Sequence, residues 1–406
     1  MYKIAVISFH GCPVARLGER DTGGMNVYVL QTAKVLGRLG HQVDIYTRYH
    51  DHNDLPITEL ENNVRIIHLK AGPLGEPKNN LPLHIPQFLS ELNSFKASHN
   101  LQYDLVHSHY WLSGKVGINL SKEWDIPHVI SFHTLAKIKE KALIQEKAPL
   151  NRVRGELDII EQAHAIIGMS DYEKNDLVKL YGASLQKISV IQPGVDLKLF
   201  KPIDKNVAKQ SLGLGTERII LFVGRIEILK GIDILIEAFA SLPDPLKKLL
   251  IVGGNSVKDN QITRLKQKAE QLGVINQIDF IGTIPQDQLP IYYNAAELTV
   301  VPSYYESFGL VALESMACGT PVIASRVGGL QDIVKHNKTG YLIPWRSPDS
   351  FAQQINTLLE NKSLHNSMSI ESISEASKMG WDKTVRNLLS LYECLLFSLK
   401  NNMAMK

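Results

Sequence analysis

The sequence of 406 residues is poor in cysteine, nearly balanced in charge and free of long apolar runs. Its three cysteines, Cys12, Cys318 and Cys394, are odd in number and widely spaced, and no Cys-x-x-Cys pair occurs. This pattern excludes a disulfide framework and indicates a reduced, cytoplasmic protein. A net charge of only +3 provides no basic field for nucleic acid. A membrane span needs roughly 20 consecutive apolar residues, and none is present, so we expect no stable membrane insertion.

Short β-branched runs alternate with longer amphipathic stretches, which is typical of parallel sheets covered by helices on both faces. The runs of the first half lie at 3–9, 43–47, 64–69, 104–107, 128–132 and 165–169. After a turn-rich stretch at 192–202 the series restarts, with runs at 219–223, 249–252, 278–281, 298–301 and 322–324. Helical patterns lie at 25–39, 155–164, 311–318 and 382–400.

The sequence therefore predicts an α/β protein with two doubly wound, Rossmann-like domains, at 1–195 and 196–380. A C-terminal helix within 381–406 is expected to pack back on the first domain. Ligands of such sheets bind beyond the carboxyl ends of the strands, so we expect both domains to face an interdomain cleft. No pattern in the sequence assigns an oligomeric state.

Two adjacent glycines, Gly23 and Gly24, follow the first predicted strand and precede a helical pattern. Without side chains the backbone can approach a ligand closely, and the free N–H groups of a helix N-terminus suit a phosphate. A tight turn is the simpler interpretation of the same pair. The dinucleotide fingerprint Gly-x-Gly-x-x-Gly is missing from this turn, which disfavours a hydride-transfer enzyme.

A second candidate anion site follows the first strand of the second domain, where Arg225 and Lys230 lie close in sequence. The planar fork of an arginine and the mobile charge of a lysine together suit a diphosphate. The alternative is a pair of surface cations, because most arginines and lysines are exposed. The spacing does not match a Walker A loop, so a P-loop is not expected.

Two glutamates, Glu306 and Glu314, lie eight residues apart across a predicted loop-to-helix junction. Carboxylates accept hydrogen bonds from the vicinal hydroxyls of ribose and hexose, and the helix start adds N–H donors. Glu314 falls among apolar residues, so its carboxylate requires a partner. For Glu306, a solvated surface side chain is a stronger alternative interpretation than it is for Glu314.

These residues resemble those of the retaining glycosyltransferases of family GT4, which have the GT-B fold, and the resemblance spans nearly the whole chain. It is carried by Gly224-Arg225 with Lys230-Gly231, and by the Glu-x7-Glu element in PSYYESFGLVALESMACGTPVIAS, residues 302–325. Val327-Gly328-Gly329 and Lys338-Thr339-Gly340-Tyr341-Leu342 also match. The resemblance implies transfer of a hexosyl unit from a nucleotide sugar, expected to be UDP-GlcNAc or UDP-glucose, with no metal ion or other cofactor.

The resemblance also implies roles for single residues. Arg225 and Lys230 would bind the donor diphosphate, Glu314 the ribose, and Glu306 the transferred sugar. His133 would hydrogen-bond the donor sugar, although a buried structural imidazole is the alternative for this residue. The implied catalytic residues are His133, Arg225, Lys230 and Glu306. The implied donor-binding residues are Gly23, Gly24, Arg225, Lys230, Glu306, Ser307, Phe308, Gly309, Leu310 and Glu314.

The first half is similar to two groups within this family, the inositol-phosphate N-acetylglucosaminyltransferases of mycothiol synthesis and the sucrose-phosphate synthases. Both use a small phosphorylated acceptor. By this resemblance the acceptor would be bound by Asn26, Lys78, Tyr110, Thr134 and Arg154. Two cations and two hydroxyls make a chemically reasonable phosphate site. Met25 stands where sucrose-phosphate synthases often have Gln, which favours an inositol phosphate over fructose 6-phosphate.

Two alternatives remain open on the sequence, a lipid acceptor and a non-catalytic sensor. Cations between Lys137 and Arg154 form a basic stretch that would suit a lipid acceptor at a membrane surface. A non-catalytic nucleotide-sugar sensor would have the same fold, because fold alone does not establish activity. The clusters His107-Ser108-His109 and His50-Asp51-His52 contain metal-binding side chains, but no further ligands follow at metal-site spacing. We therefore expect no metal site.

Overall fold

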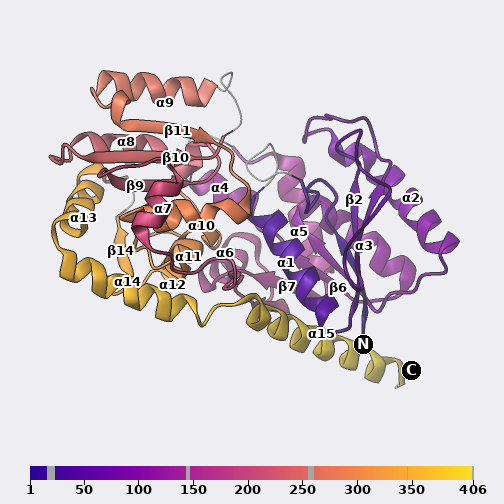
Figure 1. Cartoon of the computed structure of the whole chain (residues 1–406). Coiled ribbons are helices and arrows are strands. Elements are labelled where there is room, and N and C mark those ends of the chain that lie inside the picture. The colour runs from indigo at the N-terminus through magenta and orange to yellow at the C-terminus, as the bar shows by residue number, and fades with distance from the viewer. Residues whose placement is uncertain (16–22, 143–146, 255–259, 345, 405–406) are drawn as a thin grey trace. The chain divides into compact units, whose positions relative to one another are not determined.

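The structure is a computed structural model that describes residues 1–15, 23–142, 147–254, 260–344 and 346–404. The described chain divides into two compact units (Figure 1). Unit 1 contains Met1–Ala15, Gly24–Gln192 and the C-terminal segment from Trp381 onward. Unit 2 contains Pro193–Gly380 and is grouped with Gly23. Each unit is described by itself below.

Unit 1 is built on an eight-stranded sheet in the order β3-β4-β2-β1-β5-β6-β7-β8. Every strand pair is parallel except β3 with β4, which is antiparallel. The strands are β1 (Lys3–Ile7), β2 (Gln42–Arg48), β3 (Ile57–Glu61), β4 (Val64–Leu69), β5 (Leu105–His109), β6 (His128–Ser131), β7 (Ala165–Gly168) and β8 (Ile188–Val190). The inner strands are almost fully buried, as expected where helices cover both faces of a parallel sheet.

Amphipathic helices flank this sheet (Figure 1). They are α1 (Gly24–Arg38), α2 (Ile85–Ser98), α3 (Tyr110–Trp124), α4 (Ala136–Ala142), α5 (Leu150–Gln162), α6 (Asp171–Tyr181) and α15 (Trp381–Ala404), with the 3₁₀ turns η1 (Leu81–His84) and η2 (Leu185–Lys187). The local sequence fixes their ends. Ser170 caps α6 by accepting a hydrogen bond from the Glu173 N–H, and Gly182 ends the helix in the left-handed conformation.

Unit 2 has a six-stranded, all-parallel sheet in the order β11-β10-β9-β12-β13-β14. The strands are β9 (Arg218–Val223), β10 (Lys247–Val252), β11 (Ile278–Gly282), β12 (Leu298–Val301), β13 (Val322–Ser325) and β14 (Gly340–Ile343). The helices are α7 (Lys205–Ser211), α8 (Ile232–Ala240), α9 (Asn260–Gln271), α10 (Leu289–Ala295), α11 (Leu310–Ala317), α12 (Leu330–Ile333), α13 (Pro348–Glu360) and α14 (Lys362–Ala376), with η3 (Ile228–Lys230), η4 (Ile275–Gln277) and η5 (Gln286–Gln288).

The strand order of unit 2 is that of a Rossmann fold, and the six strands β4-β2-β1-β5-β6-β7 of unit 1 repeat it. The expectation of two doubly wound Rossmann-like sheets is therefore confirmed. In each sheet the order reverses at one point, between β1 and β5 and between β9 and β12. The chain leaves the sheet in opposite directions there, so the loops after these four strands are where a ligand site is expected.

Three strands were not predicted from the sequence, namely β3, β8 and β14. Strand β3 carries polar residues and is only partly buried, so it has no apolar run. Strand β8 is three residues long. Strand β14 begins at Gly340, whose added Cβ would lie 1.8 Å from the Val322 carbonyl oxygen. Its pairing with β13 therefore depends on a close backbone contact that only glycine allows, and hydrophobic periodicity does not reveal such a contact.

The C-terminal helix α15 belongs to unit 1 and packs against α1 (Figure 1). Its buried residues Trp381, Val385, Leu388 and Tyr392 recur every three to four positions and form one apolar stripe. The hydroxyl of Tyr392 lies 2.7 Å from Nδ1 of the buried His107 on β5. Within the described residues, no helix is both long enough and apolar enough to span a membrane.

We expect Tyr392→Phe to destabilise unit 1, because the substitution leaves His107 Nδ1 buried without its partner. An unsatisfied buried polar group costs about 1–3 kcal/mol. Urea unfolding of the full chain should show this loss. Phe397→Ala on the same helix is the control, since Phe397 is 67% exposed. Equal stability of Tyr392→Phe and the wild type would show that this hydrogen bond does not anchor α15.

Candidate active site

In unit 2 the loops that follow β9 and β12 are held against each other by backbone contacts. The Tyr304 N–H donates to the Leu229 carbonyl at 2.8 Å. Gly231 has a φ of 63°, and an added Cβ would lie 2.1 Å from the Pro302 carbonyl oxygen. Only glycine allows this approach. The contact places Lys230 beside the segment that carries Glu306.

Lys230 and Glu306 form a close ion pair, with 2.6 Å between Nζ and Oε2. The two side chains retain only 21% and 15% of their exposure. Arg225 lies on the loop after β9 and pairs with Glu227 at 2.8 Å, with 37% of each side chain exposed. The structure thus brings three of the four predicted catalytic residues into neighbouring loops of one unit, with both cations accessible.

The residues from Glu306 to Leu310 form a turn that opens helix α11 and is supported from beneath. The Gly329 N–H donates to the Glu306 carbonyl at 3.0 Å, and an added Cβ at Gly328 would lie 2.0 Å from that oxygen. Phe308 is buried, and Gly309 has a φ of 105° at the N-cap of α11. The predicted donor-binding segment is therefore a rigid helix start, where backbone N–H groups favour an anion.

Glu314 lies inside α11 with only 5% of its surface exposed. Its carboxylate accepts a hydrogen bond from the Tyr293 hydroxyl at 2.9 Å and one from the Gln286 amide at 3.2 Å. These are the partners that its apolar surroundings require. Burial nevertheless raises the pKa of Glu314 to about 7, so its proton is bound more tightly than in water.

In unit 1 the predicted acceptor residue Tyr110 is the centre of a cation cluster. It follows β5 with a φ of 74° and is 7% exposed. Lys78 Nζ lies 4.5 Å from the centre of its ring, and the Arg152 guanidinium carbon lies 5.0 Å from it. The ring of His10, on the loop after β1, is 4.5 Å away. Cations over an aromatic face are attracted to its quadrupole.

Arg152 also connects this cluster to Thr134. Its guanidinium donates to the Thr134 carbonyl at 2.9 Å, to the Thr134 hydroxyl at 3.1 Å and to the buried Glu156 at 2.7 Å. The predicted cation Arg154 lies two residues further along α5 and is exposed. Positions two apart on a helix face different directions, so the structure brings Arg152, rather than Arg154, to Lys78, Tyr110 and Thr134.

The signal for Arg152 was present in the sequence as helix register. Glu156, Ile159 and Ile160 mark the buried side of α5, and Arg152 is one turn before Glu156. Such a position places its side chain beside the core. The sequence was interpreted as a charged helical region at 137–156 and a separate amphipathic stretch at 155–164, so this register was not used.

His133 follows β6 in the left-handed conformation, with a φ of 60°. Its Nε2 lies 2.9 Å from Nδ1 of His109, and the ring of Tyr28 packs at 5.2 Å. Burial lowers the pKa of His133 to about 3, so the imidazole is neutral at physiological pH. A neutral His133 can donate or accept a hydrogen bond but contributes no charge.

The remaining predicted residues lie at the start of α1. Gly24 is the first residue of this helix, directly after Gly23. Asn26 is buried, and its amide donates to the Cys12 carbonyl at 2.7 Å. Asn26 therefore ties the helix start to the loop that follows β1.

Two family models match the chain. One, described as "Glycosyl transferases group 1", matches residues 204–374, and one described as "Glycosyltransferase Family 4" matches residues 22–199. D-inositol 3-phosphate glycosyltransferase 2 of Catenulispora acidiphila is 38% identical over an alignment of 402 positions that covers 96% of this chain and 94% of that protein. The D-inositol 3-phosphate glycosyltransferase of Nocardiopsis dassonvillei is 39% identical over 405 residues, with the same coverage of 96% and 94%.

Solved structures similar to this chain were also found. Sucrose-phosphate synthase from Thermosynechococcus elongatus superposes with a TM-score of 0.92 at 34% identity, covering 98% of this chain and all of that one. Anabaena HepE, at 21% identity and a TM-score of 0.79 over 97% of this chain and all of that one, shares the fold. The chain belongs to the family 4, group 1 glycosyltransferases, and its two Rossmann-like sheets are those of the GT-B fold.

The pKa of Glu314 predicts a pH dependence of stability. The native state retains a proton between the ordinary pKa of 4.5 and about 7 that the unfolded chain releases. Stability contributed by this proton is complete below pH 4.5 and is lost as pH rises through 7, by up to about 3 kcal/mol. Glu314→Gln removes the titration.

Thermal unfolding between pH 4.5 and 8 measures this effect. The stability of the wild type should fall relative to Glu314→Gln as pH rises. Glu371→Gln on α14, which replaces an exposed carboxylate, should keep the wild-type slope. Parallel curves for wild type and Glu314→Gln would contradict the buried, protonated carboxyl.

Proposed function

We propose that this protein transfers a hexosyl unit from a UDP-sugar, UDP-GlcNAc or UDP-glucose, to a small phosphorylated acceptor of the inositol phosphate kind. Transfer proceeds with retention of the anomeric configuration and needs no metal ion. One observation carries the proposal, namely the pair of cations, Lys78 and Arg152, on the ring of the buried Tyr110. Arg152 is already paired with Glu156 at 2.7 Å, so a phosphate monoester would join this pair and add a charge-assisted contact to Lys78.

The donor is bound by groups of unit 2. Arg225 and Lys230 bind the diphosphate, and Glu314 accepts hydrogen bonds from the ribose hydroxyls. Lys230 is already paired with Glu306 at 2.6 Å, so a diphosphate that binds Lys230 must join or replace that contact. Glu306 and the N–H groups of Ser307, Phe308, Gly309 and Leu310 then remain for the hydroxyls of the transferred sugar.

Charge stabilisation is the main catalytic contribution that these residues offer. As the glycosidic bond breaks, negative charge grows on the diphosphate, and Arg225 and Lys230 stabilise it. The departing phosphate oxygen lies on the same face as the incoming hydroxyl and accepts its proton, which retains the configuration. Retaining glycosidases instead use two carboxylates about 5 Å apart. The neutral His133 donates a hydrogen bond to the donor sugar, and Gly23 and Gly24 leave room for the diphosphate.

The acceptor is bound by groups of unit 1. Lys78, Arg152, Tyr110 and Thr134 surround the phosphate, and Asn26, in α1, contacts the acceptor hydroxyls. Similarity over 96% of the chain to D-inositol 3-phosphate glycosyltransferases supports an inositol phosphate acceptor. Similarity at 34% identity to a sucrose-phosphate synthase supports fructose 6-phosphate as the alternative. The phosphate site accounts for either one.

Cytoplasmic location is part of the proposal, because Cys12, Cys318 and Cys394 are free and nucleotide sugars are substrates of the cytoplasm. The lipid-acceptor alternative has less support than the sequence suggested. In the basic stretch, Lys137 donates to the Leu180 carbonyl at 2.6 Å and so faces the protein rather than a lipid surface.

A donor–acceptor matrix tests the proposal. Purified protein in EDTA is incubated with UDP-, GDP- and ADP-sugars, together with inositol phosphate, fructose 6-phosphate or their dephosphorylated forms. Free nucleoside diphosphate, the coupled product and its anomeric configuration are measured. We expect transfer from UDP-sugars to phosphorylated acceptors only, with an α-linked product. Transfer only to dephosphorylated acceptors, an inverted product or no transfer with any pair would contradict the proposal.

Two matched substitutions on α5 test the phosphate site. Arg152→Lys keeps the charge beside Glu156 but removes the fork that reaches Thr134. We expect it to raise KM for the phosphorylated acceptor about 10-fold, with KM for the donor unchanged, because a charge-assisted contact is worth about 1.5–3 kcal/mol.

Arg154→Lys is the control, and its KM for the acceptor should match the wild type. Initial rates at saturating donor separate KM from kcat. A larger rise in KM for the acceptor in Arg154→Lys than in Arg152→Lys would assign the acceptor phosphate to Arg154, as the sequence alone suggested.

A further inference from the structure

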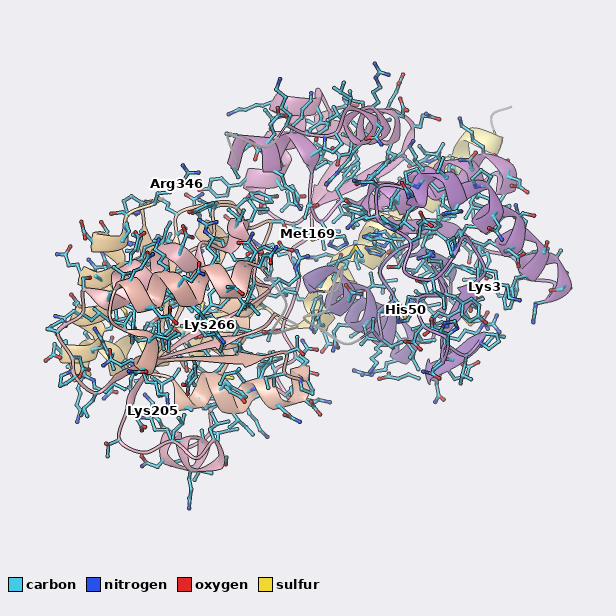
Figure 2. The ribbon with its side chains drawn as sticks, turned by 90° about the horizontal axis from the view of Figure 1, so that it is seen from above. Lys3, His50, Met169, Lys205, Lys266 and Arg346 are labelled. Carbon is cyan, nitrogen blue, oxygen red and sulfur yellow. The ribbon has the colours of Figure 1, made fainter. Side chains whose placement is uncertain are left out.

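Three side chains of metal-binding chemistry, from distant parts of the sequence, meet in unit 1, and none of them is assigned to substrate above. Cys12 follows β1, His50 lies between β2 and β3, and His68 is on β4. One ligand atom from each lies within 4.8 Å of the other two. Cys12 and His68 are buried, and His50, labelled in Figure 2, is exposed. Access for an ion is therefore from the His50 side.

The contact between Cys12 and His68 has the spacing of two ligands on one ion. Sγ lies 3.4 Å from Nε2. Bonds of about 2.0–2.3 Å in a tetrahedral zinc site place a sulfur and a nitrogen ligand about 3.5 Å apart. The atoms therefore need little movement to bind a common ion.

His68 is oriented by its second nitrogen. Its Nδ1 lies 2.7 Å from the Leu55 carbonyl, and a carbonyl can only accept, so Nδ1 carries the proton. Nε2, which faces Cys12, then presents its lone pair. A hydrogen bond from the outer ring nitrogen to a backbone carbonyl is the usual support of a metal-binding histidine.

A carboxylate completes the charge of the cluster. Asp54 Oδ2 lies 2.7 Å from His50 Nδ1, and Asp54 Oδ1 lies 3.9 Å from His68 Nε2. The Asp54 side chain also accepts from the backbone N–H groups of His50 and Asp51 at 2.8 and 3.0 Å, which orders this loop. One thiolate and one carboxylate together balance a divalent ion, so the bound ion would bring no net charge into the partly buried site.

We propose that Cys12, His50 and His68 bind one divalent metal ion of the zinc type, with Asp54 as the charge-balancing neighbour. One thiolate and two imidazoles favour Zn²⁺ over Mg²⁺ or Ca²⁺, which prefer oxygen ligands. Binding exchanges the Cys12 thiol proton for the ion, and this proton leaves to solvent.

The site is structural rather than catalytic. It joins the loop after β1 to the β2–β3 connection and to β4. The Cys12 carbonyl already accepts the amide of Asn26 at 2.7 Å. An ion on Cys12 therefore holds the segment against which the start of α1 is positioned. The sequence could not show the site, because its ligands are 38 and 18 residues apart along the chain.

Cobalt(II) substitution tests the proposal on the full-length, tag-free chain after dialysis against a chelator. Titration with Co²⁺ should produce a thiolate-to-cobalt charge-transfer band that saturates at one ion per chain, and equimolar Zn²⁺ should abolish it. Cys12→Ser should lose the band. His50→Ala should weaken Zn²⁺ binding at least about 100-fold, and Asp54→Asn should weaken it less, as expected of an outer neighbour.

His52→Ala is the matched control. His52 is two residues from His50 in the same exposed loop and lies outside the cluster. It should bind Zn²⁺ as the wild type does, and Zn²⁺ should raise the thermal midpoint of His52→Ala and of the wild type but not of His50→Ala. Both variants change an exposed side chain, so folding does not obscure the comparison.

Absence of a thiolate band in the wild type, or an equal loss of affinity in His50→Ala and His52→Ala, would overturn the proposal. Transferase activity is measured in parallel in EDTA. Because the metal readout is spectroscopic, its result is independent of whether the proposed substrates are correct.

Discussion

The point at which each parallel sheet reverses its strand order is the constraint on which the rest of this structure depends. Beside that point the loops after β1 and β5, and after β9 and β12, leave the sheet in opposite directions. His10 and Tyr110 come from the first pair of loops, and Lys230 and Glu306 come from the second. The buried strands set where these loops begin, and contacts between the loops, such as that of the Tyr304 N–H with the Leu229 carbonyl, then position the groups proposed to bind ligands.

Nearly every buried charge among the site residues has a partner. Lys230 pairs with Glu306, and Arg152 pairs with Glu156. Glu314 is the informative exception, because it has two neutral donors but no cation, and burial raises its pKa to about 7.

The sequence predicted the two sheets well because buried parallel strands produce continuous apolar runs. It named Lys230, Glu306 and Glu314 as candidates through the resemblance to family GT4, and the structure brings Lys230 and Glu306 into contact. It did not predict β3, whose pairing is polar, nor Arg152, whose role depends on helix register. The meeting of Cys12, His50 and His68 was out of reach as well, since it depends on which strands lie side by side. Local pattern thus defines elements and motifs, whereas tertiary neighbours define clusters.

The central claim is that unit 1 recognises the phosphate of the acceptor through Lys78 and Arg152. The most direct measurement is calorimetric titration of the UDP-loaded protein with inositol 3-phosphate and, separately, with inositol. The account predicts binding of the phosphorylated ligand that weakens as salt is raised, and binding of inositol that is at least about 10-fold weaker. Equal affinity for the two ligands, or affinity for the phosphorylated one that is unchanged by salt, would contradict it.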